Sequence, residues 1–352
     1  MNKNLIFIDW PNERLEPVLI TYNRAKYLER TLNYFYNAGL TSMKLHILDN
    51  NSTDNTREIV MQYQNKWPFL KYHKNKYNIG GNANILRAIE IVDSEYSWVI
   101  GDDDEWYLDD LNELMEQLKK GDADIIRLGW LVSERSKGKM LFATDLTASE
   151  KMFFASVSMI SATIVKRDLF KRYLPEAYMN TGDAYPQLVP FIRGYEEGPL
   201  KVYSLKKDIM LHTPSSEPGY YVGLEWFAGW FRTGRFFNNE KNCEQFINEV
   251  MYYTIFMNYK KVNFLGQIRL FDNILTNALR VKALGFPQAK HLLSMIAYGK
   301  GWRIHLFFVI ILYSMAPKWL LTPIMKILRS LLHRPDIETA RKKILSGRYN
   351  RL

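Results

Sequence analysis

The sequence predicts an α/β protein with a mostly parallel β-sheet and helices on both faces of that sheet. From residue 18 to about residue 132, short apolar runs alternate with segments whose apolar residues recur at helical spacing. Such alternation favours right-handed βαβ crossovers, which make neighbouring strands parallel. The turns after the first strands are polar, small or charged, and parallel sheets hold their sites at this edge. With 352 residues and 47% hydrophobic composition, the chain can bury a core in two or three domains.

Strands and helices follow one another regularly in the first half. The predicted strands are residues 18–21, 44–49, 69–73, 97–100 and 123–132. The predicted helices are residues 27–39, 54–66, 82–92 and 108–121. The helix at 82–92 places Ile85, Leu86, Ile89 and Val92 on one face, and the first helix ends on Gly39, a natural helix stop.

The pattern after residue 133 is less regular. It predicts a hairpin at 135–143, a strand then a helix at 157–174, a helix at 180–192, and one or two strands at 200–214. Residues 222–298 are aromatic-rich and helical in pattern. We therefore predict an α/β domain at 1–220, a helical region at 221–300 and a basic amphipathic tail at 301–352.

The cysteine content and the first residues indicate the cellular compartment in which the protein works. Cys243 is the only cysteine, so the chain can form no internal disulfide, and a reducing compartment fits. The first residues do not resemble a signal peptide, because their apolar stretch is short and charges follow at once.

The tail predicts a membrane-interface segment. The chain has a net charge of +10, and residues 300–352 hold eleven Lys or Arg against two acidic residues. The uncharged run at 306–316 is well short of the roughly 20 residues that span a bilayer. Trp302 and Trp319 flank this run, and residues 319–334 mix basic with apolar side chains, as in helices on an anionic membrane surface. A buried helical core and a transmembrane hairpin are the alternatives, and nucleic acid fits this apolar run poorly.

Three consecutive carboxylates follow the fourth predicted strand. Asp102, Asp103 and Asp104 come directly after an apolar run and Gly101. Adjacent carboxylates repel, and desolvation raises a carboxyl pKa unless a cation is near. Mg²⁺ normally binds one or two carboxylates together with substrate phosphates. The alternative is a solvated turn with an acidic helix start, but the polar turns after the other strands favour a metal site.

Four motifs together resemble a known family. The segments are 19-LITYNR-24, 48-LDNNSTDNT-56, 78-NIGGNAN-84 and 98-WVIGDDDE-105. In order and spacing they resemble a family 2 glycosyltransferase with the GT-A fold, of the bacterial surface-polysaccharide (O-antigen) type. The resemblance is strong over roughly the first 130 residues and loose on to about residue 215. It implies nucleotide-sugar chemistry and does not specify the sugar.

The resemblance assigns nucleotide-sugar contacts to the strand-end turns. The residues concerned are Thr21, Tyr22, Asn23, Arg24, Asp49, Asn78, Gly81, Asn84, Asp102 and Asp103. Backbone groups and the Tyr22 ring would hold the nucleotide, and Asp49 would accept hydrogen bonds from a base or a ribose. Asp49 could instead belong to the turn that caps the next helix. Gly80 and Gly81 permit close backbone approach.

The resemblance also implies a divalent metal, Mg²⁺ or Mn²⁺, at the acidic cluster. Asp102 and Asp104, which have DxD spacing, form the predicted ligand set together with His212. The metal would neutralise charge on the leaving nucleoside diphosphate. Gly101 stands where the commoner D-x-D-D form has its first Asp, so the direct ligand stays open among the three aspartates. His212 could equally be structural.

An inverting transfer needs a base that deprotonates the acceptor hydroxyl. The resemblance places this base at Asp183, with helix capping as its alternative role, and Glu196 and Glu197 are weaker candidates.

The predicted site and tail together indicate a metal-dependent glycosyltransferase at the cytoplasmic face of the inner (plasma) membrane. It would move a sugar, with inversion, from a nucleotide-diphosphate sugar to a glycan hydroxyl, with the glycan carried on a polyprenyl diphosphate. One alternative is a nucleotidyltransferase acting on a sugar phosphate. Such an enzyme needs a glycine- and Lys/Arg-rich loop after the first strand to bind a triphosphate, and residues 21–24 lack one. The other is a catalytically inactive membrane-bound scaffold, which Gly101 favours and the intact acidic cluster disfavours.

Overall fold

The computed structural model describes residues 9–182, 185–211, 230, 233–243, 245–246, 249 and 323. The chain divides into two compact units, Met1–Tyr220 together with Leu352, and Tyr221–Arg351. The first unit contains all the described strands.

Only a few residues of the second unit are described. They include a short 3-10 helix, η2 (Gly234–Phe236), and the rings of Phe237 and Phe246, whose centroids are 5.3 Å apart. The predicted helical region at 221–300 and membrane-interface tail at 301–352 lie almost entirely outside the described residues, and they stay predictions.

The strands of the first unit form two larger sheets and one small ribbon. They are β1 (Val18–Thr21), β2 (His46–Asp49), β3 (Lys71–Lys74), β4 (Tyr96–Ser97), β5 (Val99–Ile100), β6 (Glu105–Trp106), β7 (Ile125–Arg127), β8 (Lys139–Phe142), β9 (Thr163–Lys166), β10 (Lys201–Ser204) and β11 (Met210–Leu211). One sheet, in the order β3-β2-β1-β5, is parallel throughout. The other, in the order β4-β9-β7-β10-β8, is mixed, and β6 pairs antiparallel with β11. The α/β class predicted from the sequence is confirmed.

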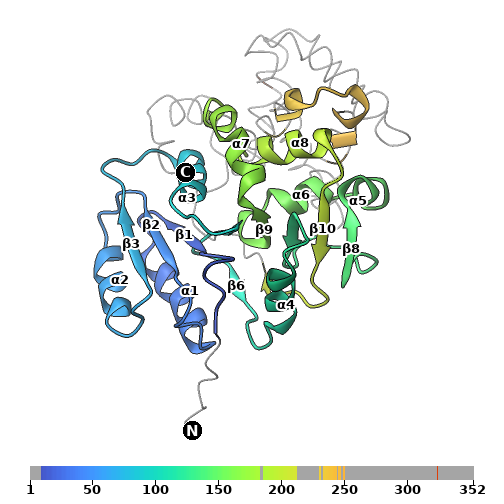
Figure 1. The fold of residues 1–352 in the computed structure, drawn as a ribbon. Coiled ribbons are helices and arrows are strands. Elements are labelled where there is room, and N and C mark those ends of the chain that lie inside the picture. Colours follow the sequence, from blue (N-terminus) through green and yellow to red (C-terminus); the bar gives the residue numbers. More distant parts are fainter. Residues whose placement is uncertain are drawn as a thin grey trace. The chain divides into compact units, whose positions relative to one another are not determined.

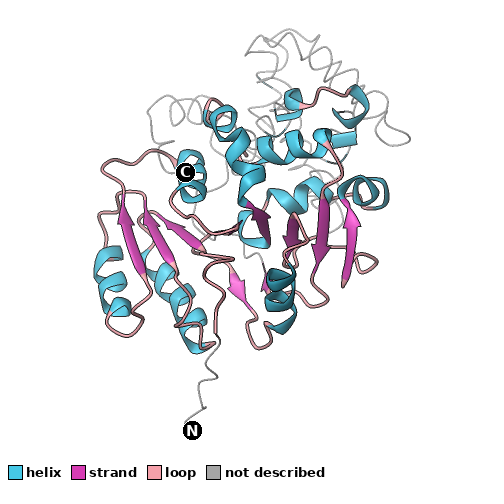
Figure 2. Ribbon diagram, in the orientation of Figure 1, coloured by secondary structure: helices cyan, strands magenta, loops and turns pink. Residues whose placement is uncertain are grey.

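Helices flank these strands, as Figures 1 and 2 show. They are α1 (Ala25–Asn37), α2 (Thr56–Gln64), α3 (Gly81–Glu90), α4 (Asn112–Lys120), α5 (Ala143–Ser149), α6 (Phe153–Ser158), α7 (Arg167–Tyr178) and α8 (Leu188–Glu197), with the 3-10 turn η1 (Ile160–Ala162). Helix α1 contacts α2, α3 contacts β1, and α7 packs against both α3 and α8. The early helices follow the predicted apolar spacing and bury their apolar side chains.

Trp98 lies where one predicted strand splits between the two sheets. β4, before it, pairs antiparallel with β9, and β5, after it, pairs parallel with β1. The buried indole N–H donates to the carbonyl of Ser161 at 2.9 Å. The Trp106 ring lies 5.5 Å from the Trp98 ring and 5.1 Å from the Phe35 ring. These edge-to-face contacts anchor α1 and β6 beside the acidic turn at 101–104.

The predicted hairpin at 135–143 is wrong. β8 has no partner in this segment and instead pairs antiparallel with β10, with Lys139 opposite Ser204. An alternating pattern states which face of a strand is buried but not which strand lies next to it. The partner is therefore chosen by the tertiary fold.

The predicted helix at 180–192 begins later than expected. Helix α8 starts at Leu188. Tyr185 has a φ of 62°, in the left-handed region, so a right-handed helix cannot pass through this residue. The sequence offers no signal for this conformation, because aromatic residues seldom adopt it.

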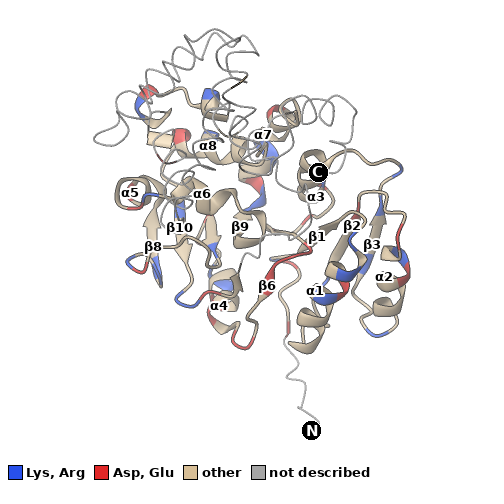
Figure 3. Ribbon diagram, turned by 180° about the vertical axis from the view of Figure 1, so that it is seen from behind, with Lys and Arg blue, Asp and Glu red and all other residues tan. Residues whose placement is uncertain are grey.

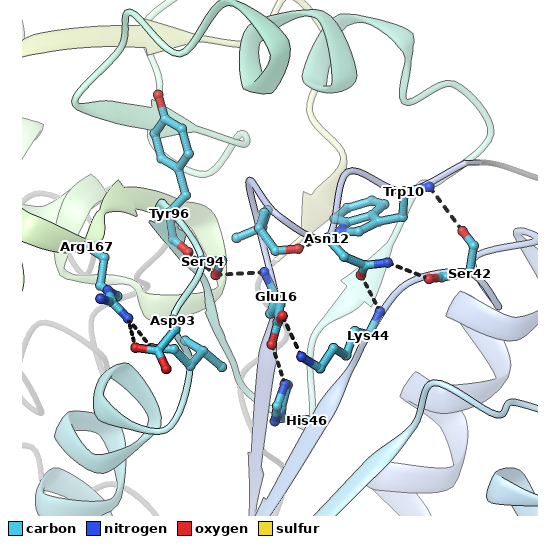
Figure 4. A network of polar contacts seen from close by, with 12 residues as sticks. Trp10, Asn12, Glu16, Ser42, Lys44, His46, Asp93, Ser94, Tyr96 and Arg167 are labelled. Atoms are coloured by element: carbon cyan, nitrogen blue, oxygen red, sulfur yellow. Dashed lines mark hydrogen bonds and ion pairs between the residues drawn. The ribbon is translucent and has the colours of Figure 1, made fainter.

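A chain of polar contacts runs from Glu16 to Lys44 and His46 (Figure 4), and from His46 on to His73 of β3. Glu16 accepts from Lys44 Nζ at 2.7 Å and contacts His46 Nε2 at 2.8 Å. The other ring nitrogen of His46, Nδ1, lies 2.9 Å from His73 Nε2, and the two rings are stacked. If Glu16 accepts the Nε2 proton of a neutral His46, then Nδ1 is left to accept from His73. The carboxylate thus sets the tautomer of both rings.

We predict acid destabilisation from this chain. Burial lowers the pKa of His46 below its usual value, with Lys44 and Lys71 acting the same way and Glu16 opposing them. Burial, His46 and Arg87 lower the pKa of His73. The unfolded chain therefore binds more protons than the folded chain as pH falls below about 6.5, and each unit of pKa difference costs about 1.4 kcal/mol of stability.

Urea denaturation between pH 7 and pH 5 measures this loss. The variant His73→Gln keeps a donor for His46 but does not titrate, so its stability should fall less steeply over this range. Equal slopes for the two proteins would contradict the assignment.

Candidate active site

The polar turns predicted from the sequence meet at the carboxyl ends of β1, β2 and β5. Thr21 Oγ1 donates to Asp102 Oδ2 at 2.7 Å, which joins the end of β1 to the turn after β5. The backbone N–H of Asn23 donates to Ser52 Oγ at 2.8 Å, which joins the turns after β1 and β2. Figure 3 shows the acidic segment in red between β1 and β6. The motifs therefore form one connected site, as the parallel-sheet rule predicts.

Side-chain amides connect the turn after β2 to the start of α3. Asn50 Nδ2 donates to Asn78 Oδ1 at 2.8 Å, and Asn75 Nδ2 donates to Asn50 Oδ1 at 2.9 Å and to Asn84 Oδ1 at 2.8 Å. The backbone N–H of Gly80 also donates to Asn78 Oδ1. The structure thus brings Asn78 and Asn84 to the site, where they fix the loop that opens α3. Any direct contact of these two residues with a nucleotide stays a prediction.

Strained backbone is found at the strand ends. Among the residues that the structure describes, four non-glycine residues have positive φ: Asn23, Asn51, Leu131 and Tyr185. Asn23 and Asn51 occupy the turns after β1 and β2, and asparagine tolerates this conformation because its short side chain bonds locally. Leu131, in the loop after β7, and Tyr185 are residue types that seldom adopt a positive φ, and such strain often marks functional segments. The motif search identified neither of these two residues.

Asp49 is fully buried at the end of β2. Its Oδ1 accepts the backbone N–H of Ser52 at 2.7 Å, and its Oδ2 accepts the hydroxyl of Tyr72 at 2.6 Å. Burial raises the pKa of Tyr72, and the bond to Asp49 raises it further. Asp49 therefore holds the turn that faces the site, and the nucleotide contact predicted for it stays a prediction.

Asp102 is buried and held by residues of β1 and α1. Besides the Thr21 hydroxyl, Arg24 Nη1 lies 3.0 Å from Asp102 Oδ1, and Thr31 Oγ1 donates to the Asp102 carbonyl at 2.9 Å. Burial raises the pKa of Asp102 to about 7, while Arg24 and the Thr21 hydroxyl lower it. The contacts with these two residues are what oppose protonation of this carboxyl.

Two guanidinium groups from α1 and its first turn reach the acidic cluster. Arg24 Nη2 lies 2.9 Å from Asp103 Oδ2, and Arg30 Nη2 donates to the Asp103 carbonyl at 2.5 Å. The carbon Cζ of Arg24 lies 4.3 Å from the centre of the Tyr27 ring, and that of Arg30 lies 5.4 Å from it. Motif reading identified Arg24 but missed Tyr27, Arg30 and Thr31. Their spacing of three or four residues on one helix face is the signal that could have found them.

Gly101 lies in a cradle of oxygen atoms. A Cβ at this position would lie 3.4 Å from Asp103 Oδ1, 3.4 Å from Ser161 Oγ and 3.5 Å from Asp104 Oδ2. The Gly101 N–H donates to Ser161 Oγ at 2.8 Å. Carboxylate oxygens are the ligands that Mg²⁺ and Mn²⁺ prefer, and Mg²⁺ needs only one or two carboxylates when substrate phosphates complete the shell. Asp103 and Asp104 therefore fit a divalent cation.

Two predicted residues lie outside the described part of the chain. His212, a predicted metal ligand, and Asp183, the predicted base, are not among the described residues. Throughout the part of the chain that the structure describes, no group of three or more His, Cys, Asp or Glu side chains is arranged to hold a metal ion. The structure does describe contacts of Thr181, two residues before Asp183, and of Glu197, one of the weaker candidates for the base. Asn82 Nδ2, in the first turn of α3, donates to the Thr181 carbonyl at 3.0 Å, and Glu197 forms an ion pair with Arg172.

Solved structures share this architecture at low sequence identity. The S. aureus TarS 1–349 complex with UDP-GlcNAc matches 85% of this chain and 91% of its own, with a TM-score of 0.53 and 16% identity. The mannosyltransferase PcManGT from Pyrobaculum calidifontis, in complex with GDP-Man and Mn²⁺, matches 89% and 90%, with a TM-score of 0.50 and 13% identity. These likenesses show that the chain shares its fold with these glycosyltransferases, as expected of a GT-A fold.

The sequence comparisons match a family domain to the first half of the chain. Residues 18–173 match the model of glycosyl transferase family 2. The GalNAc(5)-diNAcBac-PP-undecaprenol beta-1,3-glucosyltransferase of Campylobacter jejuni is 23% identical over 266 residues, which are 70% of this chain and 85% of that protein. Abequosyltransferase RfbV of Salmonella typhimurium is 35% identical over 101 residues, 28% of this chain and 30% of that protein. Residues 18–173 therefore form a glycosyl transferase family 2 domain, as predicted, and these relatives support glycosyltransferase activity over the nucleotidyltransferase alternative.

We predict that the Tyr72 hydroxyl stabilises the site. Tyr72→Phe would leave Asp49 Oδ2 buried without its donor, which should lower the free energy of unfolding by about 1–3 kcal/mol. Chemical denaturation measures this change. Tyr77→Phe is the matched control, because Tyr77 is 65% exposed in the following loop and its loss of a hydroxyl should be neutral. An equal effect of the two substitutions would refute a specific role for the Tyr72–Asp49 bond.

Proposed function

We propose that this glycosyltransferase is metal-dependent and inverting, and that it transfers a sugar from a nucleotide-diphosphate sugar to a lipid-linked glycan. The observation that supports this most directly is the convergence of Asp102, Asp103 and Asp104 with the turns after β1 and β2, through the Thr21 and Arg24 contacts. Such convergence places carboxylates, backbone N–H groups and amides around one point at the sheet edge. That arrangement suits a diphosphate with its cation.

The nucleoside would lie over the turns after β1 and β2. The nucleoside would contact backbone groups of Tyr22, Asn23 and Gly81 and the ring of Tyr22. The hydrogen bond from the Asn23 N–H to Ser52 Oγ holds the turns after β1 and β2 together. Asp49, at the end of β2, would either accept a hydrogen bond from the base or ribose or hold the turn that contacts the nucleoside. The identity of the nucleotide is left to experiment.

Asp103 and Asp104 would hold Mg²⁺ or Mn²⁺. Their Oδ1 and Oδ2 atoms are the carboxylate oxygens next to Gly101, whereas the Asp102 carboxylate is already bonded to Thr21 and Arg24. The proposed ligand pair therefore shifts by one residue from the DxD pair Asp102 and Asp104. When bound, the cation supplies Lewis-acid stabilisation of the departing diphosphate.

Asp183 is the proposed base. Two residues earlier, the Thr181 carbonyl accepts from Asn82 Nδ2 in the first turn of α3, which follows the glycine pair. Glu197 is a weaker candidate, because it lies in the last turn of α8 and is half exposed in an ion pair with Arg172.

The proposed acceptor is a glycan on a polyprenyl diphosphate at the cytoplasmic membrane face. The name of the Campylobacter relative states an undecaprenol-diphosphate-linked acceptor, and the relative is matched over 85% of its length. The basic, apolar sequence of the tail at 301–352 suits an interfacial location. In the part of the chain that the structure describes, no helix is both long enough and apolar enough to cross a bilayer.

Calorimetric titration with UDP, GDP, CDP and dTDP, with and without Mn²⁺, tests this function. One nucleotide should bind, and Mn²⁺ should strengthen its binding. Asp104→Asn should reduce this Mn²⁺-dependent gain by roughly tenfold or more, because a charged oxygen ligand is lost. Asp109→Asn, an exposed aspartate on the same segment, is the control and should bind like the wild type. Absence of binding by all four nucleotides in a folded, lipid-supplemented sample would reject the proposal.

A further inference from the structure

Arg24 contacts the acidic cluster from the turn after β1. The motif assigns this side chain to the nucleotide, but its two terminal nitrogens lie 3.0 Å from Asp102 Oδ1 and 2.9 Å from Asp103 Oδ2. The guanidinium therefore bridges two neighbouring carboxylates of the acidic cluster. Only 9% of the Arg24 side chain is exposed, so these contacts are largely shielded from water.

The surroundings fix this bridge in place. The guanidinium lies over the Tyr27 ring, one turn further along α1, and stacking on an aromatic face suits its planar charge. Asp102 is itself fixed by the Thr21 hydroxyl and, through its carbonyl, by Thr31. Both ends of the ion pair are thus held by protein contacts, and their mutual attraction acts in a poorly hydrated site.

This bridge engages one oxygen of Asp103, a carboxylate whose other oxygen is proposed to hold the divalent cation. Arg24 already neutralises part of the charge of three consecutive carboxylates and engages one oxygen each of Asp102 and Asp103. A cation bound next to the same carboxylates would be repelled by the guanidinium at short range. A bound diphosphate adds negative charge, which reduces that repulsion and gives the guanidinium a second anionic partner.

We propose that Arg24 competes with the divalent cation for the acidic cluster, so that the metal binds weakly by itself and strongly only together with a diphosphate. Arg24 is in this respect a positioning residue that couples metal binding to nucleotide binding. The inference rests on the metal site proposed for Asp103 and Asp104.

Titration with Mn²⁺ alone at pH 8 tests the competition. Arg24→Gln keeps hydrogen-bond donors but removes the charge, and it should bind Mn²⁺ at least about fivefold more tightly than the wild type. Arg30→Gln is the matched control. It removes the same charge beside the same Tyr27 ring, but Arg30 contacts only the Asp103 carbonyl, so the gain in affinity should be clearly smaller.

Several outcomes would overturn the competition. Unchanged or weaker Mn²⁺ binding by Arg24→Gln would show that the arginine organises the ligands instead of competing with the metal. An equal gain in Arg30→Gln would reduce the effect to net charge. If Arg24→Gln does not unfold cooperatively, Arg24→Lys takes its place. It keeps the positive charge but cannot bridge both carboxylates, so its gain in Mn²⁺ affinity should be smaller than that expected of Arg24→Gln, and no gain at all would reject the proposal.

The outcome is separable from that of the proposed function. Absence of nucleotide binding by the wild type in the presence of Mn²⁺ would reject the glycosyl-donor site. The Arg24 comparison uses no nucleotide, and its result depends only on whether the guanidinium and the metal share the carboxylates.

Discussion

The placement of three carboxylates in a buried turn is the constraint on which the rest of this site depends. Adjacent charges in such a place are costly unless cations and hydrogen-bond donors face them. β1 and α1 supply these partners: the Thr21 hydroxyl, the Thr31 hydroxyl and the Arg24 guanidinium all reach the turn after β5. The parallel pairing of β1 with β5 is what brings them there. Sheet topology and site electrostatics are therefore coupled.

Packed rings and side-chain amides surround this turn. Trp98 and Trp106 pack on Phe35, and Asn50, with its amide partners, fixes the turn after β2. Asp49 ties that turn to β3 through Tyr72. Polar groups within this network bond to one another before any ligand arrives. A site ordered in this way loses little conformational entropy when a nucleotide binds.

Gly101 gives this site a feature of its own within the acidic motif. The commoner form of the motif has an aspartate here, whereas in this chain Ser161 Oγ and oxygens of Asp103 and Asp104 surround the glycine. One carboxylate fewer lowers the local negative charge. With Arg24 added, the site has a weaker field for a lone cation, which is consistent with a metal that arrives together with a diphosphate. The cation-to-carboxylate balance is thus set by residues far apart in sequence.

The sequence by itself determined the α/β class, the edge of the sheet at which the site lies, and the residue types that gather there. These follow from local periodicity and from the polar turn after each strand, both of which are short-range properties. Only the tertiary structure decided which groups pair. Arg24 finds Asp102 and Asp103 across 78 and 79 positions, β8 chooses β10 over a hairpin partner, and Tyr185 adopts a left-handed conformation that delays α8. Periodicity records which face of an element is buried, but the choice of partner depends on contacts between distant segments that no local pattern encodes.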